Sequence, residues 1–279
     1  MLLATVLALS AAGLHATWNL LLKQAPSAER DLTSWGLFTV GGLLGIPVLA
    51  VTGGPGWSVA GWIVLSAMVH TAYVLVLTSA YRHGDFSLAY PLARGGGALV
   101  AALGGVVLLG DSLAALAWVA VLVVAVGLLS LVDRGLPALA LRDALLTALA
   151  IGSYTLIDAH GARLASSPVA YGFSSGLATA VGLAIVLGLR GRGPALRAAL
   201  PAAWKTWAIA GVCTAGAYTL VLIAMTRAPV GYVAMLRESS VVVGAAMGWL
   251  VLREPLGGRR LVSSAVVLCG LVGLVATTL

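Results

Sequence analysis

The sequence predicts an all-α integral membrane protein, whose ten transmembrane helices form two inverted repeats of five helices each. Three observations support this prediction. Of the 279 residues, 61% are hydrophobic and only 9% are charged, which is too few charges for a soluble domain of this length. Clusters of charged residues, Gly and Pro divide the chain into ten apolar runs, most of them about 20 residues long, as a membrane-spanning helix requires. The first five runs and the last five are related copies.

The spans follow one another through short connections. The first run is too long for a signal-peptide core and has no basic residue before it, so we interpret it as a span. The predicted spans are Leu2–Lys23, Ser34–Gly53, Ala60–Tyr81, Ser87–Leu109, Ser112–Val132, Arg142–Arg163, Pro168–Leu189, Trp204–Thr226, Pro229–Leu252 and Arg260–Leu279. We expect one compact membrane domain, in which residues 1–135 form the first repeat and residues 136–279 the second.

Matching residues in the two halves identify the repeat. The segment from Tyr90 to Arg94 aligns without a gap with the segment from Val233 to Arg237, and the alignment continues to an acidic residue beyond each span. At the start of each half, a Gly and two polar or aromatic residues also match. Each half has an odd number of spans, so the second half must enter the membrane from the opposite side. This arrangement is an inverted repeat, in which substrate sites form near the midplane between the halves.

The positions of the basic residues predict the orientation. Of the 16 Lys and Arg residues, Arg94 and Arg237 lie within spans, and only Arg163 and Arg227 lie at even-numbered connections. The others lie at odd-numbered connections, which the positive-inside rule places in the cytoplasm, with both termini outside. We therefore expect a multi-pass protein of the plasma (cytoplasmic, inner) membrane, surrounded by the lipid bilayer. The net charge of +7 belongs to membrane-surface loops and does not indicate nucleic-acid binding.

Arg94 and Arg237 are the first candidates for a functional site. A guanidinium does not lose its proton, and in the middle of a membrane helix it costs about 3 kcal/mol even on lenient insertion scales. Their equivalent positions in inverted copies predict one arginine on each side of the midplane. We hypothesise that they bind a carboxylate or phosphoryl group, which matches the fork of guanidinium donors. Alternatively, each arginine forms a structural ion pair with Glu238 or Asp158. A gated salt bridge, which opens when the substrate binds, would be consistent with both hypotheses.

Aromatic and polar residues at helical spacing indicate a cavity near these arginines. His15, Trp18 and Asn19 share one helix face, as do Tyr154 and Asp158 on the sixth span. Facing inward, such residues would give aromatic walls with a few polar groups, as small-molecule sites have. The predicted substrate-binding residues are Arg94, Arg237, His15, Trp18, Asn19, Tyr73, Tyr90, Tyr154 and Tyr218.

A second group of residues is predicted to serve coupling or gating. Asp158 and Glu238 are the acids expected to lie deepest in the membrane, so protons are a candidate coupling ion, with His70 as a weaker relay candidate. Pro91, Gly95 and Gly96 flank Arg94 and predict a broken or bendable helix there. Close helix packing is the alternative reading of the glycines. Asp111, Asp143 and Glu254 lie at span ends, where we expect them to be solvated.

These motifs resemble the drug/metabolite transporter superfamily, specifically its ten-span EamA-type family with two EamA repeats. The resemblance rests on the segments His15–Lys23, Ala80–Gly95, Tyr154–Asp158 and Arg227–Leu256, and it extends over essentially the whole chain. It implies a ten-helix EamA-like fold and the export or exchange of amino acids, other metabolites or drugs. Members are usually described with both termini in the cytoplasm, which is the reverse of what the loop charges predict here.

The sequence as a whole predicts a secondary active transporter, either an exporter or an exchanger, that works by alternating access. Its substrate would be a small anionic or zwitterionic metabolite, such as an amino acid, an organic acid or a phosphorylated compound. A lipid-head-group translocase would use the same arginines but open its cavity laterally. An intramembrane enzyme would need an acid/base pair, a nucleophile or a metal site, and the sequence offers no such spacing. We expect no cofactor, no metal and no obligatory protein partner.

Overall fold

The computed structural model describes residues 1–83, 86–130, 137–252 and 258–277, and within these ranges the regular structure is helical. The first half contains α1 (Leu2–Gln24), α2 (Arg30–Thr52), α3 (Ala60–His83), α4 (Phe86–Leu109) and α5 (Ala115–Leu129), with short 3₁₀ helices η1 (Ser27–Glu29) and η2 (Trp57–Val59). The second half contains α6 (Ala138–Leu164), α7 (Pro168–Leu189), α8 (Gly193–Met225), α9 (Val230–Arg237), α10 (Ser239–Leu252) and α11 (Gly258–Ala276). The repeat boundary predicted between residues 135 and 136 lies outside the described residues.

Local sequence signals set several helix ends. The side chain of Ser167 accepts a hydrogen bond from the backbone N–H of Ala170 at 3.2 Å, and Pro168 occupies the first turn of α7. Gly53, Gly110 and Gly191 follow the ends of α2, α4 and α7 with positive φ angles of 76°, 69° and 65°. Glycine has no Cβ and adopts this left-handed conformation without strain, so each residue lets the chain leave its helix and turn back.

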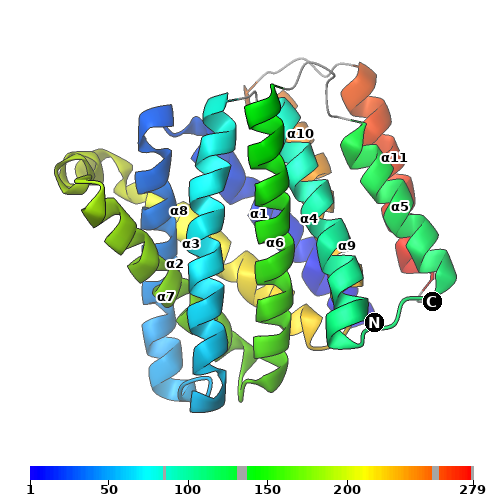
Figure 1. The fold of residues 1–279 in the computed structure, drawn as a ribbon, viewed down its shortest axis with the longest axis horizontal. Coiled ribbons are helices and arrows are strands. Elements are labelled where there is room, and N and C mark those ends of the chain that lie inside the picture. Colours follow the sequence, from blue (N-terminus) through cyan, green and yellow to red (C-terminus); the bar gives the residue numbers. More distant parts are fainter. Residues whose placement is uncertain (84–85, 131–136, 253–257, 278–279) are drawn as a thin grey trace.

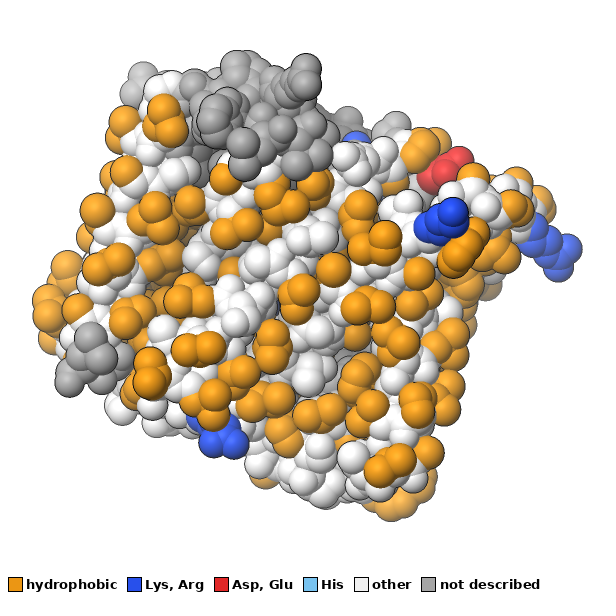
Figure 2. Space-filling model, turned by 180° about the vertical axis from the view of Figure 1, so that it is seen from behind, with side chains coloured by type: hydrophobic (Ala, Val, Ile, Leu, Met, Phe, Trp, Pro, Cys, Tyr) orange, Lys and Arg blue, Asp and Glu red, His pale blue; other side chains and the backbone are white. Residues whose placement is uncertain are grey.

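The helices have the length and polarity of membrane spans. Within the described residues, seven helices are long and apolar enough to cross a membrane, and α5 and α11 are shorter apolar helices. The ninth predicted span is divided into α9 and α10. Hydrophobic side chains are spread over the face shown in Figure 2, and the Lys and Arg side chains visible there lie near its margins. This is the surface of a protein surrounded by lipid, so the prediction of an all-α multi-pass membrane protein is confirmed.

Equivalent helices of the two halves make corresponding contacts. α1 packs on α8 just as α6 packs on α3, and α2 packs on α8 just as α7 packs on α3. The contact of α4 with α6 corresponds to the contacts of α9 and α10 with α1, and α5 packs on its own counterpart, α11. α1 and α6 run in opposite directions, and the N-terminus and the end of α11 lie at one edge of the molecule (Figure 1), here called the terminal edge. The opposite edge, where α1 ends and α2 begins, is called the far edge.

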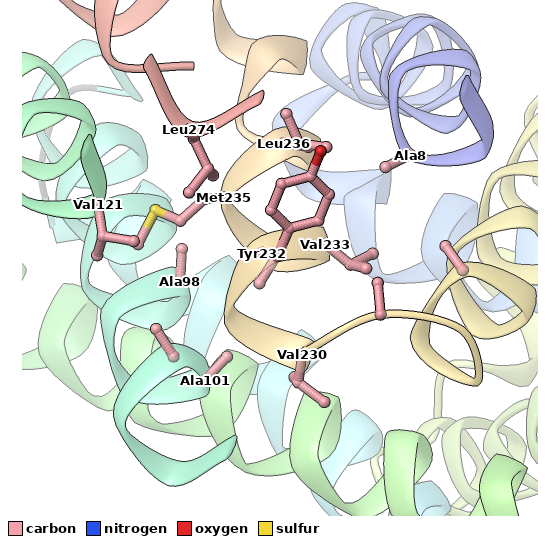
Figure 3. Close-up of a cluster of buried hydrophobic side chains, with 14 of the residues drawn as sticks. Ala8, Ala98, Ala101, Val121, Val230, Tyr232, Val233, Met235, Leu236 and Leu274 are labelled. Carbon is pink, nitrogen blue, oxygen red and sulfur yellow. The ribbon is translucent and has the colours of Figure 1, made fainter. Parts of the chain in front are cut away.

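The short helix α9 lies in the centre of the largest hydrophobic cluster. All eight of its residues are buried. Figure 3 shows Tyr232, Met235 and Leu236 of α9 pointing between the surrounding helices, which contribute small or branched side chains such as Ala98 on α4. The hydroxyl of Tyr232 is hydrogen-bonded to the hydroxyl of Thr5 on α1 at 2.7 Å. The tightly packed α9 therefore holds its C-terminal end, and with it Arg237, in a fixed place.

Glycines allow α4 and α6 to approach each other closely. A Cβ atom added to Gly152 on α6 would lie 2.5 Å from Cβ of Val100 and 3.3 Å from the carbonyl oxygen of Gly97, both on α4. Distances this short between carbon atoms are repulsive, so no larger residue fits without moving the helices apart. The contact fixes α4, and thus Arg94, relative to the second half.

The substitution Gly152→Ala is expected to destabilise the protein by about 1–3 kcal/mol, because an extra methyl group at this contact overpacks it. Gly13 on α1 provides a matched control, since it is the position equivalent to Gly152 in the first half and a Cβ there would meet no atom within 4 Å. Gly13→Ala should be neutral or stabilising, because Ala is the better helix former. Thermal unfolding in detergent measures both variants, and equal melting temperatures would contradict the prediction.

Candidate functional site

The ninth span is broken at a single residue, and this break separates two charged side chains. The backbone N–H of Glu238 donates to the carbonyl oxygen of Met235, and the N–H of Val241 donates to the carbonyl oxygen of Glu238, both at 2.9 Å. These i−3 bonds replace the i−4 bonds of an α-helix and tighten the chain locally. Arg237 lines a cavity, whereas the next residue, Glu238, contacts α4.

Glu238 forms an ion pair with Arg94 that joins the two halves. Nε and Nη2 of Arg94 donate to Oε2 and Oε1 of Glu238 at 3.1 and 2.7 Å, and the two side chains are 2% and 0% exposed. This two-pronged geometry is the strong form of the arginine–carboxylate interaction. The structure places Arg94 outside the cavity lining, so the interpretation as a structural ion pair describes Arg94 well.

The cavity lies between the halves, with walls from α1, α2, α3, α6, α8 and α9. It has about 60 Å³ of space for the centres of water-sized molecules, whereas a single water needs roughly 10–15 Å³ on that measure. Its lining is mainly apolar and aromatic, with few polar groups, as in small-molecule sites. The lining residues are His15, Trp18, Leu22, Ser34, Leu37, Phe38, His70, Tyr73, Val74, Leu77, Tyr154, Thr214, Ala217, Tyr218, Val221 and Arg237.

The cavity extends toward the far edge. Leu22 lies near the end of α1, Ser34 near the start of α2, and Leu77 in the last two turns of α3, and all three of these helix ends are at the far edge. A second cavity, of about 40 Å³ on the same measure, adjoins it between α2, α7 and α8. His70, Thr214 and Tyr218 line both cavities, so they stand between the two spaces.

Arg237 is the charged group in the cavity lining that lacks an ionic partner. Its residue is 4% exposed, and within the described residues no carboxylate oxygen lies within 4.0 Å of its guanidinium nitrogens. Its Nε atom and the hydroxyl of Thr214, also in the lining, are buried without a hydrogen-bond partner in the part of the chain that is described. Buried polar groups normally find partners, so these two atoms indicate a place where water or a solute binds.

Asp158 lies in a second polar cluster, formed by α3, α6, α7 and α8. Its Oδ1 accepts a hydrogen bond from the hydroxyl of Tyr171 at 3.0 Å, and its Oδ2 accepts one from the hydroxyl of Tyr218. Nδ1 of His70 lies 3.9 Å from Oδ2. The ring of His70 stacks on that of Tyr154 with centroids 4.0 Å apart and contacts Tyr218 edge-on at 5.7 Å. This cluster therefore connects Asp158 to the cavity wall.

The predicted residues of α1 separate into two groups. His15 and Trp18 line the cavity, and the indole Nε1 of Trp18 donates to Nδ1 of His15 at 3.2 Å. Asn19 instead donates to the carbonyl oxygen of His15 at 2.7 Å and is not among the lining residues. Of the predicted tyrosines, Tyr73, Tyr154 and Tyr218 line the cavity, while the side chain of Tyr90 lies outside the described part of the chain.

Of the predicted broken or bendable helix beside Arg94, the structure contradicts the break. α4 is continuous from Phe86 to Leu109, through Pro91 and the glycines, and the break occurs in the second copy at Glu238. A Cβ on Gly95 would lie 3.1 Å from Cβ of Leu128, and a Cβ on Gly96 would lie 2.9 Å from Cβ of Ala148. The glycines thus serve close packing against α5 and α6, and packing holds the helix together.

Sequence reasoning missed three residues of the Asp158 cluster. Ser66 on α3 lies one turn before His70, with its Oγ 3.2 Å from Nδ1 of His70. Ser175 on α7 lies 2.8 Å from Ser66, Oγ to Oγ, and Tyr171 lies one turn before Ser175. The i, i+4 spacing of the polar residues on each helix was the available signal. Which helices face each other was not readable from the sequence.

The terminal edge of the molecule is closed by an ion pair between Asp111 and Arg163. Nη1 and Nη2 of Arg163 donate to the two carboxylate oxygens of Asp111 at 2.8 and 3.2 Å, and Nε donates to the carbonyl oxygen of Met225 at 2.9 Å. Oδ2 of Asp111 also accepts the first N–H of α9, from Val230, at 2.7 Å. These bonds tie together the ends of α4, α6 and α8 and the start of α9. Asp111, with a side chain 10% exposed, is therefore not the solvated residue that its position predicts.

Asp143 is likewise buried, at 2% exposure, although we expected it to be solvated, and the third such acid, Glu254, lies outside the described residues. Its Oδ1 accepts hydrogen bonds from Nε and Nη2 of Arg142 at 2.9 and 2.8 Å, and its Oδ2 accepts one from the hydroxyl of Ser79 at 2.7 Å. The carboxylate therefore joins the start of α6 to α3. Both corrections have the same cause, because a charged residue at a span end finds partners on neighbouring helices that the sequence does not place there.

Asp111→Asn is expected to open the terminal edge. The neutral amide keeps the shape but loses the charged bond, worth about 1.5–3 kcal/mol, which corresponds to roughly tenfold or more in the open population. A cysteine at Ala228, which is 8% exposed beside this ion pair, should then react about ten times faster with a membrane-impermeant maleimide in a background lacking Cys213 and Cys269. Asp31→Asn breaks the Asp31–Arg192 pair at the far edge and serves as control. Unchanged labelling in Asp111→Asn would contradict a role in closure.

Comparisons with known proteins agree with this architecture. Residues 141–276, which hold nearly all of α6 and all of α7 to α11, match the EamA-like transporter family. Over this second half, the chain is similar to the EamA-like transporter family. A solved structure titled "Crystal structure of protein" shares 20% sequence identity over 98% of each chain, with a TM-score of 0.75, which establishes a common fold. No curated protein matches this chain. The matched half provides Asp158, Tyr218, Arg237 and Glu238.

Proposed function

We propose that this protein is a secondary active transporter, an exporter or exchanger, of a small organic anion or zwitterion that binds at Arg237. The observation that carries the proposal is a buried guanidinium that faces a cavity between the halves and has no carboxylate partner among the described residues. A permanent cation in such a place binds carboxylate or phosphoryl oxygens well. Arg94 has a different role, because Glu238 already neutralises it.

The amount of charge near the break supports an anionic ligand. Arg94, Arg237 and Glu238 carry a formal net charge of +1 at this point in the membrane interior. A buried guanidinium without a counter-ion beside it is costly, and an anion bound at Arg237 would supply that counter-ion. The aromatic rings of Trp18, Tyr73 and Tyr154 around the cavity would contact the rest of the substrate. These features support a compound that is small, partly apolar and negatively charged at one end.

Alternating access would follow from the repeat. The cavity extends toward the far edge, and the Asp111–Arg163 ion pair closes the terminal edge. Residues 1–135 and 136–279 would act as the two inverted halves, and exchange of their conformations would expose the cavity to the other side. We place the protein in the plasma (inner) membrane with the far edge in the cytoplasm, because the basic residues concentrate at that edge.

Counterflow in proteoliposomes tests this function. Vesicles loaded with unlabelled compound should take up labelled L-glutamate, succinate or glycerol phosphate when the compound outside matches the compound inside. Neutral sugars and organic cations of similar size form the control panel. We expect exchange of one or more compounds that carry a carboxylate or phosphoryl group. Exchange confined to cations or neutral sugars would contradict the proposed role of Arg237.

A further inference from the structure

We propose that Asp158 and His70 form a proton-binding site, and that binding of the anion at Arg237 is coupled to binding of a proton there. The coupling rests on the proposed function, whereas the proton site rests on geometry alone. Asp158 is 1% exposed, and within the described residues no Lys or Arg nitrogen lies within 4.0 Å of its carboxylate. Its neighbours are two tyrosine hydroxyls and the imidazole of His70.

The two deep acids differ in what neutralises them. Glu238 accepts two hydrogen bonds from the permanently charged guanidinium of Arg94, so it has a fixed counter-ion. Among the described residues, His70 is the neighbour of Asp158 that can become cationic, with 3.9 Å between Nδ1 and Oδ2. A carboxylate buried in this way is neutralised by taking up a proton, either itself or on the adjacent imidazole. Asp158 is therefore the acid that can exchange protons.

The helices packed against α6 bring a defined set of groups toward Asp158. α3 presents His70, α7 presents Tyr171 and α8 presents Tyr218, while Tyr154 precedes Asp158 by one turn on α6 itself. Across the cavity, α9 presents Arg237 and α1 presents His15. The titratable group that α4 adds among the described side chains is Arg94, which is paired with Glu238. Among the described residues around the cavity, Arg237 therefore has no carboxylate partner, and Asp158 has no Lys or Arg partner.

Charge balance links the proton to the substrate. Arg94, Arg237, Glu238 and Asp158 together carry two positive and two negative formal charges. An anion bound at Arg237 adds a negative charge to this buried set, and a proton at Asp158 or His70 removes it again. Each ligand therefore favours binding of the other, and this coupling is reciprocal. The anion and the proton would then move through the transporter in the same direction.

The cavity wall provides a route for the proton. Tyr218 and His70 line both cavities and also contact Asp158. The hydroxyl of Tyr218 donates to Oδ2 of Asp158, while its oxygen can accept a proton from water in the cavity. A proton entering from the cavity can therefore reach the carboxylate through one hydroxyl group. No rearrangement of the helices is needed for this step.

The proton site is tested without any substrate. Infrared difference spectra of the ligand-free protein in lipid are recorded over the range in which histidine ordinarily titrates, about pH 5 to 8. We expect a carboxylic-acid C=O band, or a ring band of the protonated imidazole, that appears as the pH falls, is lost in Asp158→Asn and remains in Asp143→Asn, a control at a buried acid on the same helix. If Asp158→Asn does not fold, Asp158→Glu should shift the band. A band that survives Asp158→Asn unchanged or stays unshifted in Asp158→Glu, or no titrating band, overturns the proposal.

Coupling is tested in proteoliposomes that contain a trapped pH-sensitive dye. Uptake of L-glutamate, succinate or glycerol phosphate should acidify the interior, and in Asp158→Asn the acidification per labelled molecule taken up should be lost. Transport without any pH change overturns the coupling and leaves the proposed function standing. Transport of none of these compounds contradicts the proposed function and the coupling with it. The infrared titration decides the proton site in either case.

Discussion

Replacing Arg237 with Gln is expected to abolish transport of anionic compounds while leaving the protein folded. Each hydrogen bond to a charged group is worth about 1.5–3 kcal/mol, so losing one costs roughly 10- to 100-fold in binding and losing two makes transport undetectable. The fold should tolerate the change, since the described residues include no carboxylate partner that would be left unpaired. Arg237→Lys keeps the charge but loses the planar fork of donors, so we expect an intermediate loss. Counterflow in proteoliposomes measures all three proteins.

A matched control separates loss of binding from loss of charge. Arg227 lies at the exposed end of α8, outside the cavity lining, and Arg227→Gln removes the same charge from the protein. It should transport normally. Melting temperatures distinguish the two roles of Arg237: removal of a buried charge without a partner should leave the melting temperature equal or higher, whereas removal of an ion-pair partner should lower it. Normal transport by Arg237→Gln would refute the proposed site.

Much of the fold could be predicted because the length of each apolar run determines whether it can cross the membrane as a helix. Each of the ten predicted spans corresponds to a helix or, at Pro229–Leu252, to the pair α9 and α10. The break itself was predicted in the wrong copy. Pro91 and the glycines of α4 are weak helix formers, yet tight packing on α5 and α6 keeps α4 continuous. The segment around Glu238 has better helix formers and still breaks. Tertiary contacts therefore decided the outcome in both copies.

Many residues of the candidate site could be predicted, but not which of them contact each other. Helical spacing identified His15, Trp18 and Tyr154, and the structure places all three in the cavity lining. Spacing also gives the depth of each arginine, but it does not show which one meets an acid from the other half. Arg94 and Arg237 occupy equivalent positions in the repeat, yet only Arg94 is paired with Glu238. The same limit hid Tyr171, because the contact of α7 with Asp158 is formed only in the folded protein.

Replacing Glu238 with Gln is expected to cost about 3–5 kcal/mol of stability, because it leaves the guanidinium of Arg94 buried without its counter-ion. In a chain of this size the melting temperature should fall by on the order of 10 °C. Arg94→Gln should cost a similar amount by leaving the carboxylate unpaired. The double variant Arg94→Gln/Glu238→Gln removes both charges and should recover most of the loss. Thermal unfolding of the four proteins in detergent completes a double-mutant cycle.

The double variant also decides whether the ion pair only stabilises the protein or takes part in transport. The pair joins α4 of the first half to the break between α9 and α10 of the second, so it lies where the proposed alternating access would move the halves relative to each other. If it must break and reform in each cycle, the folded double variant should transport more slowly than wild type. If it serves the fold alone, the double variant should transport at the wild-type rate. Additive losses of stability in the cycle would show that Arg94 and Glu238 do not depend on each other, contrary to their two short hydrogen bonds.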